Sequence, residues 1–155
     1  MIHIWINTEN ITLETKDLDL FDSNIDITMF CSQRSEAIDP YILSELSKRN
    51  LKYSFDCIDA GDTAENSLDF YIIASLALLE NANPEDMYLV VNTNPGYMRI
   101  LQFIAKKKGL KIRYATSLTP RKTKDLLRFK KQAPAIQDIN ELIDCITVTD
   151  VNDYI

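Results

Sequence analysis

Two short segments of the chain are apolar almost without interruption, IHIWI at residues 2–6 and MYLVVN at residues 87–92. A strand that alternates between apolar and polar residues keeps one face in solvent, whereas a continuously apolar strand is covered on both faces. Such strands are typical of a parallel sheet with helices packed on each side. The feature predicts an α/β fold with a mainly parallel central sheet.

The rest of the chain fits the same plan, because strand-like apolar runs alternate with amphipathic, helix-like segments. We expect further strands at 25–31, 51–58 and 110–114, and helices at 35–50, 63–81, 95–108, 121–129 and 136–146. A length of 155 residues suits one domain with a sizeable core. We therefore interpret 1–155 as a single domain in which 116–155 form a helical C-terminal extension.

The composition argues against several classes of protein. Cys31, Cys57 and Cys145 are far apart and show no paired spacing, which is typical of a protein of the reducing cytoplasm. With His3 as the one histidine, placed inside the first strand, neither a zinc site nor serine–histidine catalysis is expected. Three glycines cannot build a phosphate-binding loop. No apolar run reaches the roughly 20 residues of a membrane helix, and the first residues lack the basic region of a secretory signal. We expect a cytoplasmic protein with no membrane partner.

The net charge of −6 hides an uneven distribution. Residues 99–131 carry twelve basic side chains and one acid, whereas the rest of the chain carries five basic and twenty-two acidic ones. One interpretation is a nucleic-acid interface in which the basic residues line an edge leading to an acidic pocket. The alternative is that 106–108 and 121–131 are the solvated faces of two helices. The candidate nucleic-acid contacts in this region are Lys106, Lys107, Lys108, Arg113, Arg121, Lys122 and Lys124.

In a parallel sheet the functional residues lie at the carboxyl ends of the strands, near the point where the chain switches direction. The candidate functional segments are therefore Asn7-Thr8-Glu9-Asn10 and Thr93-Asn94-Pro95-Gly96. Asp69 is the one charged residue between Glu65 and Glu80, and a carboxylate on a buried helix needs a cation or hydrogen bonds. The structural alternatives are a turn at 7–10, an N-cap at Asn94 and a capping box formed by Asp62 and Glu65.

These segments resemble the motifs of the NYN branch of the PIN-like nucleases. IWINTENI is similar to a first motif in which a strand runs into Asp-x-Glu-Asn, and ENSLDFYI to a second motif, Lys-Asn-x-x-Asp, that opens a helix. LVVNTNPGYMRILQFIAKKKGLKIRYA is similar to a third, a strand ending in Ser-x-Asp-x-Gly-Phe followed by a helix, a Lys-Gly turn and a strand. Order and spacing agree over about residues 1–115. The resemblance implies a Rossmann-like three-layer sandwich and RNA cleavage that depends on Mg²⁺ or Mn²⁺.

The departures from the family pattern concern its charges. Asn7 and Asn94 stand where the family has aspartates, Glu65 stands for its lysine, and Met98 for a further acid. Glu9 and Asp69 remain as candidate metal ligands, with Asn7 and Asn94 as the other candidate catalytic positions. Asn10 and Asn66 also match the motifs and are candidate nucleic-acid contacts. Neutral amide oxygens are weaker donors to Mg²⁺ than carboxylates, so weaker metal binding is expected.

Two functional hypotheses follow. The first is a PIN/NYN-like domain with weakened or lost catalysis that binds RNA, forms a homo-oligomer or binds a protein partner. The second is an active endoribonuclease that holds Mg²⁺ or Mn²⁺ through Glu9 and Asp69, because Mg²⁺ accepts one or two carboxylates plus water. A third alternative, a flavodoxin-like regulatory domain, rests on element order alone, and a fold does not determine a function.

Overall fold

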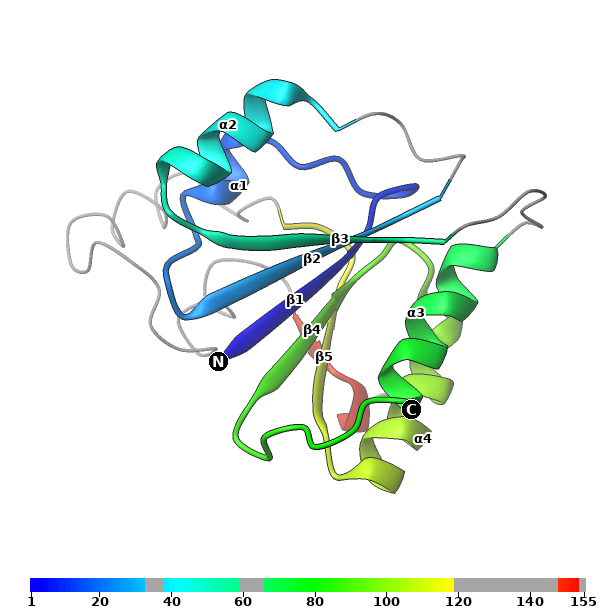
Figure 1. Ribbon diagram of the computed structural model, residues 1–155. Helices are drawn as coiled ribbons and strands as arrows, with labels where there is room; N and C mark the ends of the chain where they lie inside the picture. Colours follow the sequence, from blue (N-terminus) through cyan, green and yellow to red (C-terminus); the bar gives the residue numbers. More distant parts are fainter. Residues whose placement is uncertain (33–37, 59–65, 119–147, 154–155) are drawn as a thin grey trace.

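The protein was analysed as a computed structural model that describes residues 1–32, 38–58, 66–118 and 148–153 (Figure 1). Its centre is a six-stranded sheet with the strand order β3-β2-β1-β4-β5-β6. Strands β1 to β5 are parallel, and β6 pairs with β5 in the antiparallel sense. The predicted α/β fold with a mainly parallel sheet is confirmed. The strands are β1 (Ile2–Asn7), β2 (Ile25–Cys31), β3 (Lys52–Cys57), β4 (Met87–Val91), β5 (Lys111–Ala115) and β6 (Thr149–Asp150).

Helices cover both faces of the sheet (Figure 1). On one face lie α1 (Thr15–Leu18) and α2 (Pro40–Lys48), and on the other lie α3 (Ser67–Ala77) and α4 (Met98–Lys108). Two 3₁₀ turns, η1 (Pro95–Tyr97) and η2 (Val151–Asp153), complete the described elements. All five residues of β4 are buried, as expected for a strand between two helical layers.

The helix boundaries differ from the predicted ones for local reasons. Helix α2 begins at Pro40, because Asp39 caps it by accepting the Tyr41 N–H at 2.9 Å and proline suits the first turn. The predicted helix at 95–108 begins with the 3₁₀ turn η1, and Gly109, with φ +67°, ends α4. Elements as short as α1 and β6 were not predicted. The helices expected at 121–129 and 136–146 lie outside the described residues, as do the first residues of the one expected at 63–81.

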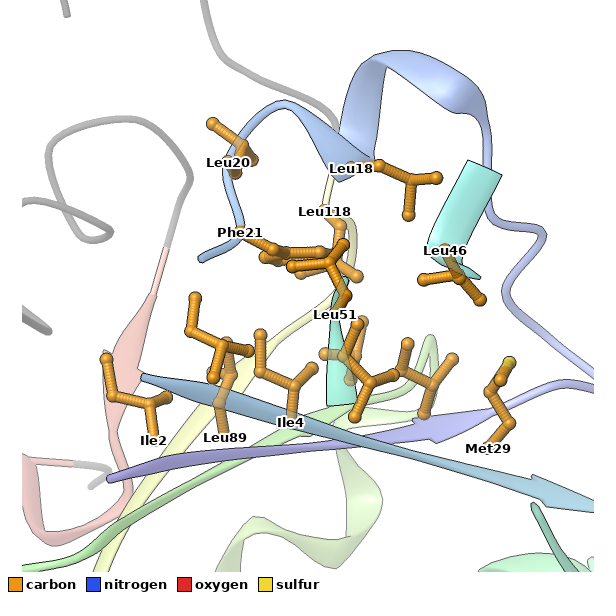
Figure 2. Close-up of a cluster of buried hydrophobic side chains, with 14 of the residues drawn as sticks. Ile2, Ile4, Leu18, Leu20, Phe21, Met29, Leu46, Leu51, Leu89 and Leu118 are labelled. Atoms are coloured by element: carbon orange, nitrogen blue, oxygen red, sulfur yellow. The ribbon is translucent and has the colours of Figure 1, made fainter. Parts of the chain in front are cut away.

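Among the described residues the core forms two apolar clusters, one on each face of the sheet. Figure 2 shows the cluster between the sheet and helices α1 and α2, which contains Ile4, Met29, Leu46 and Leu89. The second cluster contains Trp5, Leu68, Tyr88 and Leu101 under α3 and α4. Alternate residues of β1 thus enter opposite clusters, which explains why Ile4, Trp5 and Ile6 are apolar in succession.

One expectation about the cysteines is wrong. Cys31 and Cys57, the last residues of β2 and β3, face each other in the sheet register and form a disulfide, with their Cα atoms 4.5 Å apart. The sequence separation of 26 residues gave no signal, because the register of two parallel strands is set by the whole fold. The cysteine pattern therefore does not support a reducing compartment. Cys145 lies outside the described residues.

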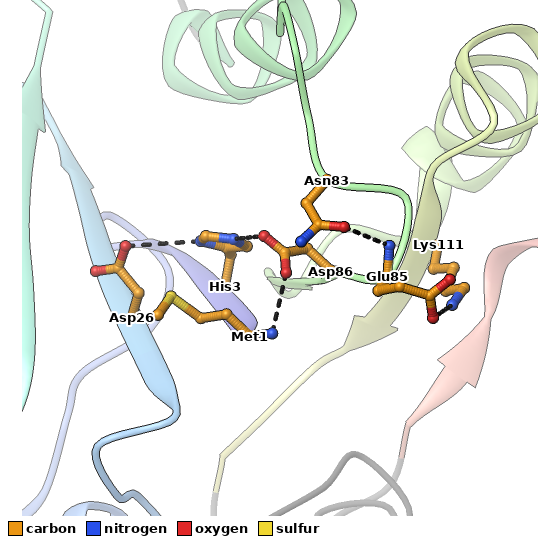
Figure 3. A network of polar contacts seen from close by, with 7 residues as sticks. All are labelled: Met1, His3, Asp26, Asn83, Glu85, Asp86 and Lys111. Carbon is orange, nitrogen blue, oxygen red and sulfur yellow. Dashed lines mark hydrogen bonds and ion pairs between the residues drawn. The ribbon is translucent and has the colours of Figure 1, made fainter.

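The amino end of the sheet carries a cluster of charged groups (Figure 3). His3 lies between two carboxylates, with Nε2 2.9 Å from Asp86 Oδ2 and Nδ1 3.6 Å from Asp26 Oδ2. Its ring also stacks on Tyr88 at a centroid distance of 4.8 Å. The amino group of Met1 donates to Asp86 Oδ1 at 3.0 Å, and these hydrogen bonds hold the pKa of Asp86 below its usual value. His3 therefore joins the amino ends of β1, β2 and β4, at the edge opposite to their carboxyl ends.

Candidate functional site

The candidate site lies where β1 and β4 are neighbours in the sheet. From β1 the chain proceeds outward to β2 and β3, and it then returns to place β4 on the other side of β1. Adjacent parallel strands whose connections leave in opposite directions form the topological switch point at which α/β proteins bind ligands. Asn7 ends β1, and Asn92 directly follows β4. The two asparagines therefore share this edge of the sheet.

The centre of the site is the carboxylate of Asp69. It stands in the first turn of α3 and is only 4% exposed, with Asn7 at 0% and Asn92 at 3%. Oδ1 of Asp69 accepts a hydrogen bond from Nδ2 of Asn7 at 2.7 Å and a second one from Nδ2 of Asn92. The buried, polar Asp69 predicted from the sequence is thus present, and amide groups satisfy it.

The neighbouring hydrogen bonds fix the direction of both amides. Oδ1 of Asn7 accepts the backbone N–H of Glu9 at 2.9 Å, so its Nδ2 must face Asp69. The Asp69 carboxylate can only accept, so Asn92 turns Nδ2 toward it, and its Oδ1 accepts from Nδ2 of Asn10 at 2.7 Å. Each of these polar groups therefore has a complementary partner. We call Asn7, Asn10, Asp69 and Asn92 the amide network.

Two tyrosines respond to the Asp69 charge. Burial, the negative charge of Asp69 and a hydrogen bond to it raise the pKa of Tyr97. Burial, together with the charges of Asp69 and Tyr97, raises the pKa of Tyr114. Both hydroxyls therefore stay protonated near neutral pH and act as hydrogen-bond donors, Tyr114 to the backbone carbonyl of Asn94.

This arrangement is a poor environment for a divalent cation at Asp69. Mg²⁺ and Mn²⁺ require oxygen ligands, whereas Asn7 and Asn92 turn their N–H groups toward the carboxylate and their oxygens away from it. Within the described residues, no three histidine, cysteine, aspartate or glutamate side chains gather in a way that could hold a metal ion. The donor set at Asp69 does not fit the metal that the resemblance implies.

The other predicted site residues lie nearby but contact different groups. The Glu9 carboxylate accepts a hydrogen bond from the hydroxyl of Ser32, just beyond β2. Oδ1 of Asn94 accepts the N–H of Gly96 at 2.9 Å, which is the predicted capping role. Gly96 suits this turn because a Cβ there would lie 3.0 Å from that oxygen. Asn66 has φ +66° at the start of α3 and makes no side-chain cap. Asp62 and Glu65 lie outside the described residues.

Asn92 is a site residue that the motifs did not indicate, because they pointed to Asn94, two positions later. A signal was present in the strands themselves. In the parallel register Ile6 lies beside Val91, so the next residue of each strand, Asn7 and Asn92, must also be neighbours. Both apolar strands end in asparagine. Aligning the ends of the two strands would have identified the pair.

The described basic residues do not line an edge leading to this site. Lys106, Lys107 and Lys108 form the last turn of α4, which runs back toward the amino edge of the sheet, away from the amide network (Figure 1). Lys108 Nζ donates to the carbonyl of Ala77 at 2.8 Å, and Arg113 pairs with Asp150. The expected edge fails here because a helix that connects parallel strands runs antiparallel to them. Arg121, Lys122 and Lys124 lie outside the described residues.

A family model described as PIN domain matches residues 1–115. A search of curated proteins finds no match. Among solved structures, a protein of unknown function from Vibrio parahaemolyticus RIMD 2210633 is similar at 13% identity and a TM-score of 0.40, over 72% of this chain and 77% of that one. Among the helices of the described ranges, none is long and apolar enough to cross a membrane.

Proposed function

The chain belongs to the PIN-domain family, and from this premise we propose that it is a PIN-like protein of the NYN type with weakened or lost ribonuclease chemistry. Metal-dependent hydrolysis of RNA needs a cation that activates water and stabilises charge on the phosphate. The proposal is therefore that this cation binds weakly or not at all, while the fold is retained.

The observation that carries the proposal is the pair of amide N–H groups on the Asp69 carboxylate. An aspartate in place of Asn7 would put two carboxylates about 2.7 Å apart, and such a pair needs a cation or a proton between them. The two amides supply that positive partial charge themselves. In this proposal the amide network stabilises Asp69 in place of a metal ion, and the module acts by binding RNA or a protein.

An active endoribonuclease is the second candidate, and the position of Glu9 is the observation in its favour. The backbone N–H of Glu9 donates to Asn7, so Glu9 lies next to the amide network. One or two carboxylates with water suffice for Mg²⁺ or Mn²⁺. In this alternative the Glu9 side chain rotates away from Ser32, and one asparagine of the amide network turns its oxygen toward Asp69. These two rotations create the metal site.

An RNA cleavage and binding assay separates the two candidates. We expect the unmodified protein to leave a labelled single-stranded RNA intact in 5–10 mM Mn²⁺, roughly a saturating level for a weak site. If the protein cleaves the RNA, and if Asp69→Asn and Glu9→Gln abolish cleavage while Glu85→Gln at the opposite edge does not, the second candidate is correct. RNA bound without cleavage, more weakly as salt rises from about 50 to 200 mM, supports the binding role.

A further inference from the structure

Helix α3 presents an outer face that has no polar side chain. Phe70, Ala74, Ala77 and Leu78 are exposed and fall on one stripe of the helix, at i, i+4, i+7 and i+8. Leu78 is 76% and Phe70 58% exposed. A helix that is apolar on all sides is normally buried on all sides. The exposed stripe of α3 is therefore unusual for a surface helix.

Helix α4 continues this face. The two helices lie side by side and run in the same direction, because Phe70 packs on Tyr97 at their first turns and Lys108 bonds to Ala77 at their last. The exposed stripe of α4 is centred on Phe103, which is 66% exposed. Arg99, Ile100, Lys106 and Lys107 flank Phe103 at three and four positions on either side.

The combined surface is apolar along α3 and basic along α4, and no acid is exposed within either stripe. A second copy of the chain is a poor occupant, since its basic stripe would meet the same positive charges. RNA is also a poor occupant, because bases stack on aromatic rings and cannot cover the aliphatic stripe of Ala74, Ala77 and Leu78. The complementary chemistry is an apolar surface bordered by negative charge.

We propose that the outer face of α3 and α4 is a docking surface for an acidic amphipathic helix of a partner protein. An amphipathic helix lays its apolar side on such a surface, with anchors at i, i+3, i+4 and i+7. The acidic residues of the partner then lie over Lys106 and Lys107. At its Phe70 end the face borders the amide network, because Phe70 packs on Tyr97 and Tyr97 bonds to Asp69, whereas Lys106 and Lys107 lie at the other end.

A synthetic peptide tests the proposal directly. The probe is a helical peptide of about 14 residues with leucine at i, i+3, i+4 and i+7 and glutamate elsewhere, a length of roughly four turns. Binding to the full chain is followed by fluorescence anisotropy. We expect saturable binding that weakens at least tenfold in the double variant Lys106→Glu with Lys107→Glu, and at least fivefold in Phe103→Ser.

The controls use exposed residues on the opposite face and other peptides. Tyr41→Ser on α2 and the double variant Lys16→Glu on α1 with Lys48→Glu on α2 should bind as the unmodified protein does. A peptide with lysine for glutamate, and one with glutamine for leucine, should not bind. No binding at 1 mM peptide, or equal binding by all variants, overturns the proposal.

Three further outcomes also overturn it, each in favour of another occupant. Displacement of the peptide by single-stranded RNA, with RNA binding lost in Phe103→Ser, assigns the face to nucleic acid. Dimer formation that Phe103→Ser abolishes assigns it to a second copy. Peptide binding that appears only when Asp138, Glu141 and Asp144 are replaced by lysine assigns the face to this chain's own residues 136–146.

Discussion

The buried carboxylate of Asp69 is stabilised by two asparagines, Asn7 and Asn92. Aspartates at these positions would instead require a cation or a proton beside Asp69. Asn7 and Asn92 each donate an amide hydrogen to it, and the backbone N–H of Glu9 holds the Asn7 amide in that orientation. Hydrogen bonds to a charged group contribute roughly 1.5–3 kcal/mol each, so the amide network is also a stabilising element.

The contribution of the amide network to stability can be tested by comparing Asn92 with the capping residue Asn94. Asn92→Ala removes one donor from Asp69 and leaves Asn10 without its acceptor, so we expect the free energy of unfolding to fall by about 2 kcal/mol. Asn94→Ala removes only the bond to the Gly96 N–H, and about 1 kcal/mol is expected. Urea unfolding of both variants measures the difference. Equal losses would mean that Asn92 has no special role.

At the scale of elements, the strands were predictable and several side-chain contacts were not. Local apolar runs located β1 to β5 within about a residue of their ends, and Asp69 was recognised because it interrupts an apolar helix. The role of Asn92 and the disulfide were not predicted, because both depend on which strands are neighbours and on the register between them. Periodicity along one segment does not encode the register between segments.

The disulfide gives a prediction at this scale. It ties the edge strand β3 to β2 across 26 residues of chain, and closing a loop of that size contributes about 3.5 kcal/mol. We expect thiol titration of the denatured, oxidised protein to find one free cysteine, and three after reduction. Reduction, or Cys57→Ser, should lower the urea midpoint. Three free thiols before reduction would show that Cys31 and Cys57 are not bonded.

For the whole molecule, two carboxylates give opposite contributions to the pH dependence of stability. The pKa of Asp86 is lowered by His3 and the amino group of Met1, so its contribution is present above the unfolded pKa and is lost as the pH falls through the folded value. Burial raises the pKa of Asp17, which is 2% exposed, so its cost grows as the pH rises from the unfolded pKa through the folded one.

Replacing each carboxylate by an amide should therefore change stability in opposite directions. At pH 7 we expect Asp86→Asn to lower the free energy of unfolding by about 1 kcal/mol, and Asp17→Asn to raise it by about 1 kcal/mol. Asn at position 17 keeps an oxygen for the Glu14 N–H, which Asp17 accepts at 2.8 Å; its NH₂ group takes the place of Oδ1, which has no hydrogen-bond partner among the described residues, and this offsets part of the gain. Both differences should shrink at pH 3. Unfolding curves at the two pH values decide whether the signs are as stated.

The claim that amide hydrogens replace a cation at Asp69 is tested most directly by Mn²⁺ titration calorimetry. We expect no measurable binding to the unmodified protein below about 1 mM, because two N–H groups face the carboxylate. The double variant Asn7→Asp with Asn92→Asp should bind Mn²⁺ at least tenfold more tightly, and adding Asp69→Asn should abolish that gain. Tight Mn²⁺ binding by the unmodified protein that Asp69→Asn removes would contradict the account.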